Sequence, residues 1–229
     1  FIMPDGDDDD DGFVENLFCK LYDNLFPNLI HIDCSNFELS DGSLERFVQI
    51  EALKNVKHLN FSSCHISNKG LRYLVSCKFL EQLEVLNLSK CNITRRGYFA
   101  FFERPCFPSL VDLSFSDCTM LLPPDSKNIP PAKSDFSFLE KFDLSGCGID
   151  DVMLDFILHS GKFTSLVKLR LDNNSLTSDG LRALALCNSL PILKTLILTE
   201  NPIDDSDIMN MCNLGFVPTT ILWSDFVDS

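Results

Sequence analysis

Ten cysteines in a chain of 229 residues raise the question of a disulfide framework or a metal site. No two of them stand in the C-x-x-C spacing that zinc sites commonly use. Four cysteines and two asparagines instead recur at one position of a repeating pattern. A position that accepts either residue favours a small polar side chain that hydrogen-bonds to a turn and forms a ladder through stacked repeats. The members of this predicted structural ladder are Cys64, Cys91, Cys118, Cys147, Asn174 and Asn201.

Histidine and serine offer two further kinds of chemistry. His31 and His58 stand at equivalent positions of the pattern, and Asp33 follows His31 by two residues, so these side chains could approach one metal ion. A third and a fourth ligand are not evident, and we predict no metal site. Serine also recurs, which indicates a role in a repeated turn and not as a nucleophile. Its recurring positions are Ser35, Ser62, Ser89, Ser116 and Ser145.

Catalytic machinery is not recognisable in the sequence. No Ser-His-Asp, Cys-His or paired-carboxylate group can be assembled from non-repeating positions, and the phosphate-loop pattern G-x-x-x-x-G-K-[ST] does not occur. We therefore predict no catalytic residues and no cofactor, and we interpret the chain as a non-enzyme.

A repeat of near-constant length must position all of these side chains. Each row of the repeat has apolar residues at its start and three, five and ten positions later, as in Leu83, Leu86, Leu88 and Ile93. The order is L-x-x-L-x-L-x-x-C/N-x-L in most rows, and the steps between rows are 27, 27, 27, 29, 27 and 27 residues. This order resembles the leucine-rich-repeat pattern. The rows start at Leu29, Val56, Leu83, Leu110, Leu139, Leu166 and Leu193.

Each row divides into two halves with different apolar periods. The x-L-x-L part alternates apolar and polar residues, which predicts a strand with one buried face. The second half has the i, i+3, i+4 spacing of a helix, as in Leu71, Leu74 and Val75. The expected N-cap residues are Ser67, Thr94 and Thr177. The fold class is therefore an α/β leucine-rich-repeat solenoid, a right-handed horseshoe with parallel strands on its concave face and helices on its convex face.

The domain boundaries follow from the same rows. We expect an acidic, flexible tail at 1–12, an N-terminal helical cap at 13–28, seven repeats at 29–219, and a truncated eighth repeat or C-terminal cap at 220–229. In the fourth repeat the sequence LLPPDSKNIPPAKSD at 121–135 replaces the helical pattern, and its prolines predict an extended convex loop. This loop is either a tolerated insertion or a docking site for a partner.

The last frame is assigned from its apolar residues. A start at Thr220 gives Trp223 the second leucine position and Asp225 the third, and it places Val217 in the apolar column that precedes each row. Replacement of a leucine by a polar residue fits a repeat that no further repeat covers.

The ladder, together with SNKGL at 67–71 and TSDGL at 177–181, resembles the cysteine-containing and ribonuclease-inhibitor-like leucine-rich repeats. The resemblance covers about residues 26–225 and implies a protein-binding scaffold. Related solenoids act as inhibitors, GTPase-activating proteins, scaffolds and substrate receptors of ubiquitin ligases. We expect a protein–protein interaction module. The alternatives are a regulator of a partner enzyme and the substrate-recognition part of a ubiquitin ligase whose other domain lies outside this sequence.

Charge narrows the choice of partner. The formal net charge is −14 and only 19 residues are Lys or Arg, which disfavours nucleic acid and favours a basic protein. No run approaches the roughly 18 apolar residues of a membrane span, and the start of the chain is acidic where a signal peptide would be basic. We expect no membrane partner and an intracellular, cytoplasmic or nuclear location. The oligomeric state stays open.

The partner-binding residues are expected on the concave face, where strand side chains point away from the core. Acidic residues predominate along the first five repeats and basic residues toward the C-terminal end, a gradient that could orient a partner. The alternative is that these residues only keep an exposed sheet soluble. The expected contact residues are His31, Asp33, His58, Asn60, Glu84, Asn87, Asp112, Ser114, Asp117, Lys141, Asp143, Lys168 and Arg170.

Overall fold

Short strands and short helices alternate along the chain because each row changes from a two-residue to a 3.6-residue apolar period. The computed structural model describes residues 18–21, 26–103, 107–119 and 136–223. The strands are β1 (His31–Asp33), β2 (His58–Asn60), β3 (Val85–Asn87), β4 (Asp112–Ser114), β5 (Lys141–Asp143), β6 (Lys168–Arg170), β7 (Thr195–Ile197) and β8 (Thr220–Leu222). The helices are α2 (Asp41–Phe47), α3 (Asn68–Val75), α4 (Arg95–Phe102), α5 (Asp151–Ser160), α6 (Ser178–Leu186) and α7 (Asp205–Asn213), with a 3₁₀-helix at Glu51–Asn55.

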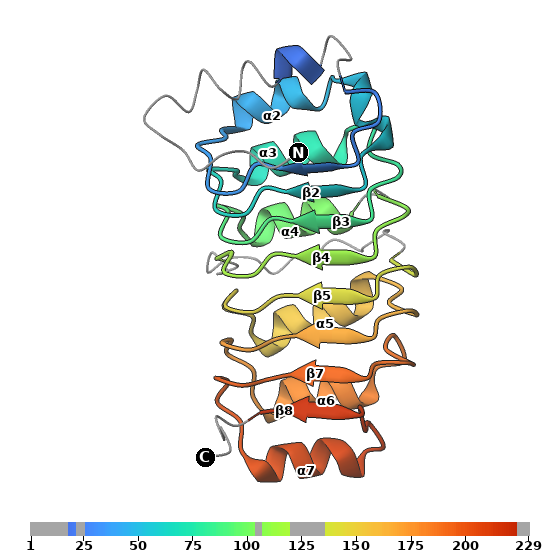
Figure 1. The fold of residues 1–229 in the computed structure, drawn as a ribbon. Helices are drawn as coiled ribbons and strands as arrows, with labels where there is room; N and C mark the ends of the chain where they lie inside the picture. Colours follow the sequence, from blue (N-terminus) through green and yellow to red (C-terminus); the bar gives the residue numbers. More distant parts are fainter. Residues whose placement is uncertain (1–17, 22–25, 104–106, 120–135, 224–229) are drawn as a thin grey trace, which may run out of the picture.

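All eight strands form one parallel sheet in sequence order, and the helices lie behind it (Figure 1). Register is constant, so the first residues of neighbouring strands pair from His31 to Thr220. The two-residue insertion between β4 and β5 leaves this register intact, because Asp112 pairs with Lys141. The predicted α/β solenoid is confirmed.

The core is a stack of apolar columns between the sheet and the helices. Within one row, Leu86, Leu88 and Ile93 are all buried, as are the helix residues Leu71 and Leu74 of the row before. Full burial of one such side chain stabilises the fold by roughly 1.5–3 kcal/mol. Because strands of three residues offer few hydrogen bonds of their own, this burial between stacked rows is the main source of stability.

The turn after each strand bends through one residue in the left-handed region. In the second row, Asn60 at the end of β2 accepts the backbone N–H of Ser62 at 3.1 Å, and Ser63 then has φ 59°. The residues with positive φ at this repeated position are Asn36, Ser63, Lys90, Asp117, Gly146, Asn173 and Glu200. The serine column thus lies in these turns, next to the bend.

The Cys and Asn side chains after these turns link each repeat to the one before it. Cys91 Sγ donates to the carbonyl of Phe61 at 3.2 Å, and burial raises the pKa of this thiol to about 11, so it keeps its proton. Asn174 Nδ2 donates to the carbonyl of Leu144 at 2.9 Å, while its Oδ1 accepts the N–H of Ile149 at 2.8 Å. One column of side chains therefore satisfies main-chain groups that stacking buries.

A second ladder, which the sequence analysis did not identify, joins the starts of neighbouring helices. Asp41, the first residue of α2, accepts the N–H groups of Ser67 and Gly70 at 2.9 and 2.8 Å. Asp151 in α5 accepts the N–H of Thr177 at 2.9 Å. A Cβ at position 70 would collide with the Asp41 carboxylate, so this ladder requires the glycine.

The three expected N-cap residues all precede their helices. Ser67 and Thr177 accept the N–H of the second helical residue. Thr94 makes no such bond, because its hydroxyl accepts the side-chain amide of Asn68 at 2.8 Å. The cap at α4 is thereby part of the second ladder.

Repeat four interrupts both the helix row and this ladder. The proline-containing segment expected to form a loop, 121–135, lies outside the described residues. Arg95 starts α4 at the position that Asp or Asn occupies in α2, α3 and α5, and it reaches Asp150 Oδ1, at the N-cap of α5, at 3.1 Å. The Arg95 side chain is only 2% exposed. The Phe102 and Phe136 rings, with centroids 4.8 Å apart, fill the adjacent core.

The eighth frame corrects the sequence-based assignment. Ile221, and not Trp223, pairs with Leu196, so the frame starts two residues before Thr220. The last connection is two residues shorter than the others because α7 is followed directly by a turn at Gly215, which has φ 94°. Val217 is consequently 69% exposed and outside its expected buried column. Trp223 instead donates from Nε1 to Asp205 Oδ1 at 2.9 Å.

The two ends of the chain are described only in part. The expected tail at 1–12 and the C-terminal residue Asp225 lie outside the described residues. Of the expected N-terminal cap, residues 18–21 are helical, and Phe18 packs on Phe47 with ring centroids 5.3 Å apart.

We expect Asn174→Ala to lower the free energy of unfolding by about 2–4 kcal/mol, because it orphans buried backbone groups on both sides of one repeat boundary. Urea unfolding followed by circular dichroism measures the change. Asn188→Ala makes the same substitution at an exposed position and should cost less than about 0.5 kcal/mol. Equal effects of the two substitutions would contradict the ladder.

Arg95→Ala should cost about 2–4 kcal/mol, because it removes a buried side chain and its ion pair across the interrupted repeat. Arg96→Ala, at the exposed neighbouring position of α4, is the matched control and should be nearly neutral. Thermal unfolding of both variants tests this expectation. A neutral Arg95→Ala would show that α4 and α5 are held by the aromatic rings alone.

Candidate functional site

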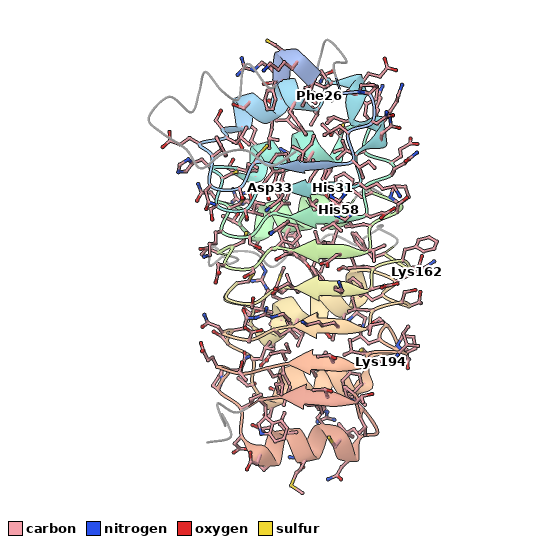
Figure 2. The ribbon with its side chains drawn as sticks, viewed as in Figure 1. Phe26, His31, Asp33, His58, Lys162 and Lys194 are labelled. Carbon is pink, nitrogen blue, oxygen red and sulfur yellow. The ribbon has the colours of Figure 1, made fainter. Side chains whose placement is uncertain are left out.

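The expected contact residues gather on the sheet face opposite the helices, called here the concave face. Eleven of the thirteen belong to strands, while Glu84 precedes β3 and Asp117 lies in the turn after β4. Their side chains are exposed or half-buried. Figure 2 shows His31, Asp33 and His58 close together at the N-terminal end of the sheet. The register thus brings together residues that are 27 positions apart in sequence.

One column of this face serves the turns as well as the surface. Asp33 accepts the N–H of Ser35 at 2.9 Å, and Asp143 accepts the N–H of Ser145 at 3.0 Å. Partial burial acts to raise the pKa of Asp33, but hydrogen bonds from Ser35 and Asn60 outweigh it and hold the pKa below its ordinary value. These carboxylates have structural work already, so they are poorer contact groups than the sequence indicated.

The charges of the face are arranged mostly as ion pairs between neighbouring strands. Lys57 Nζ lies 2.6 Å from Glu84 Oε1, and a hydrogen bond from Lys57 lowers the pKa of Glu84. Lys141 Nζ lies 3.3 Å from Asp112 Oδ2. The predicted gradient from acidic to basic is therefore divided into pairs of opposite charge.

Arg170 is held by two carboxylates. Its Nη2 lies 3.0 Å from Asp172 Oδ2, and its Nη1 lies 3.5 Å from Asp143 Oδ2. Hydrogen bonds from Asp172 raise the pKa of Arg170, so the guanidinium stays charged. The sequence analysis missed Asp172 and Lys57. The signal for Lys57 was available, since it stands 27 residues before Glu84 in the same column.

His31 and His58 are stacked, with ring centroids 4.0 Å apart and an angle of 42° between the rings. Partial burial and, next, the neighbouring His31 lower the pKa of His58. Within the described part of the chain, no group of three or more His, Cys, Asp or Glu side chains is placed to hold a metal ion.

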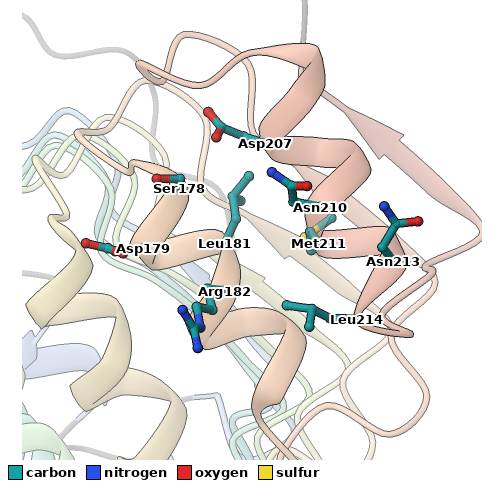
Figure 3. A pocket seen from close by; sticks show the side chains of 9 residues that line it. All are labelled: Ser178, Asp179, Leu181, Arg182, Asp207, Asn210, Met211, Asn213 and Leu214. Carbon is teal, nitrogen blue, oxygen red and sulfur yellow. The ribbon is translucent and has the colours of Figure 1, made fainter.

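A separate groove of about 520 Å³ lies between α6 and α7, away from the sheet (Figure 3). Leu181 and Met211 contribute apolar side chains to it and Arg182 a cationic one. Its origin is local, because Ser178 stands where Asp151 bridges to the next helix, and Asp207 replaces the usual glycine. The sequence analysis did not single out this groove, which holds no recognisable catalytic group.

Comparison with known families agrees with the architecture. A family model described as "Leucine Rich repeat" matches residues 52–75, 82–102, 137–152 and 164–185. Each matched segment contains one strand and at least the start of the following helix. A search of curated proteins found no match. The chain is a leucine-rich-repeat protein.

Domains of this class generally mediate protein–protein interactions and are typically binding scaffolds without enzymatic activity. None of the helices in the described residues combines the length and apolar character needed to cross a membrane. The class therefore directs attention to a protein partner and to the surface that would receive it.

Acid should weaken the fold through His58. Because its folded-state pKa lies below the ordinary value of 6.5, the unfolded chain binds the proton at higher pH, and stability falls as pH drops below about 6.5. We expect His58→Gln to lose part of the decrease in urea stability between pH 7 and 5. His65→Gln, at an exposed position, should keep the wild-type pH dependence. An unchanged pH dependence for His58→Gln would contradict this role.

Proposed function

We propose that this chain is a protein-binding module that holds one partner protein on its concave face. The observation that carries the proposal is the continuous eight-stranded parallel sheet, whose outer side no helix covers (Figure 1). At a strand spacing of about 4.8 Å the face extends for roughly 34 Å, which is enough for a standard protein interface. The net charge of −14 favours encounter with a basic partner at long range.

The proposed contact surface retains the residues expected from the sequence, with different weights. His31, His58 and Lys168 project from the sheet without a role in the turns, whereas Asp33 and Asp143 cap turns as well. We propose that the former group contributes more to affinity. The ladder of Cys and Asn side chains supports the face from within.

The cysteines favour the cysteine-containing, ribonuclease-inhibitor-like subfamily and an intracellular setting, cytoplasmic or nuclear. Every cysteine of the described residues is a free thiol, and Cys118 and Cys147 donate to main-chain carbonyls at 3.1 and 3.0 Å. A disulfide would remove such donors, so this column suits a reducing compartment. We also propose 29–219 as the binding module, with a terminal frame that starts two residues earlier than expected.

Regulation of a partner enzyme is the second function we consider, by GTPase activation or by inhibition. A rigid sheet face can cover an active site or position the partner's own catalytic groups without chemistry of its own. Addition of the protein to a bound GTPase, with measurement of hydrolysis, distinguishes activation from binding alone. The ligase-receptor alternative needs a further domain and is tested by the identity of co-purified proteins.

We expect Val85→Arg to weaken partner binding at least tenfold, because it places a bulky cation in the middle of the concave face. Val152→Arg is the matched control, since Val152 is 58% exposed on α5. The measurement is quantitative affinity purification from source cells with both variants and the wild type. Equal recovery of the same partner by both variants would exclude the concave face.

A further inference from the structure

Charge compensation on the concave face stops at β6. From β2 to β6, Lys57 pairs with Glu84, and Lys141 pairs with Asp112. Arg170 is also neutralised, by Asp143 and Asp172. Groups that already satisfy one another gain little from a partner, because binding would first have to separate them.

Two lysines at the C-terminal end differ from these. Within the described part of the chain, neither Lys168 in β6 nor Lys194, directly before β7, has a hydrogen bond or an ion pair with another residue. The strand neighbours of Lys168 are Lys141, a like charge, and Thr195, which is uncharged. This pair of lysines is therefore the uncompensated positive charge of the face, although the chain as a whole is strongly acidic.

Aliphatic side chains accompany the two lysines. The column that caps turns with Asp or Asn in β1, β2, β3 and β5 continues through Arg170 to Ile197 and Leu222. Ile197 is half-buried and Leu222 is 47% exposed. An aliphatic group cannot accept the N–H of a turn, so these residues have lost the structural role of their column. They leave apolar surface on the concave face beside two free cations.

We propose that the concave face at β6–β8 docks an acidic segment of the partner protein that carries an aliphatic anchor. This inference rests on the proposed function and names the chemistry of its partner. Carboxylates of the segment pair with Lys168 and Lys194, and an aliphatic side chain packs on Ile197 and Leu222. Three strands cover roughly 10 Å, the reach of three to four extended residues.

The overall negative charge of the chain does not oppose this contact. At physiological ionic strength charges farther than about 8 Å are largely screened, so net charge governs long-range approach, whereas direct pairs govern docking. The nearest carboxylates, Asp143 and Asp172, are occupied by Arg170. Binding of the segment should weaken as salt is raised.

The test selects random dodecamer peptides on the full chain by phage display and measures their affinity by fluorescence anisotropy. Selected peptides should combine Asp or Glu with Leu, Ile or Val, and replacement of their acids by amides should weaken binding at least tenfold. Lys168→Glu with Lys194→Glu should cause a similar loss. Lys78→Glu with Lys162→Glu makes the same charge change at exposed positions outside the sheet and should have little effect. A peptide with Lys in place of its acids should bind the reversed variant better than the wild type.

Three results would overturn the inference: basic or neutral selected peptides, acidic peptides insensitive to the reversal at 168 and 194, and no selected peptide at all. The native partner separates this inference from the proposed function. Binding that is lost in Val85→Arg but kept in the reversed variant retains the concave face and rejects the acidic segment. Binding that is kept in both variants rejects the proposed function as well.

Discussion

Lateral stacking in a fixed register is the constraint on which every other feature depends. A three-residue strand and a two- to three-turn helix cannot bury their apolar sides alone, so each repeat is stable only between its neighbours. A step of 27 residues brings each leucine column under the next, and β4 to β5 keeps that register across a step of 29. The same register places His31 against His58 and Lys141 against Lys168, so the surface chemistry is a consequence of the packing.

Main-chain groups buried by stacking need partners, and two side-chain ladders provide them. The Cys and Asn column joins strand ends, and Asp41 and Asp151 join helix starts. Where the helix row is interrupted, Arg95 extends to Asp150 in place of the missing contact. A buried guanidinium is costly without a partner, so this pair also fixes how the two halves of the solenoid meet.

The concave face combines structural and binding duties in one set of columns. Its N-terminal strands use Asp and Asn to cap turns, and its middle strands compensate their own charges. The C-terminal strands lack both arrangements, which leaves Lys168 and Leu222 available. A uniform fold can thus hold a non-uniform binding surface, because the concave positions are not needed for the core.

The sequence by itself determined the repeat, its strand and helix halves, and the columns that form the core, because each of these is a local pattern of fixed period. It also indicated the ladder from Cys64 to Asn201, since one position accepted only two residue types. Tertiary structure alone decided which charges are neutralised, because Lys57 with Glu84 and Arg95 with Asp150 depend on side-chain reach between repeats. It also moved the last frame, where Ile221 pairs with Leu196, because a short turn after α7 and not an apolar pattern sets the register there.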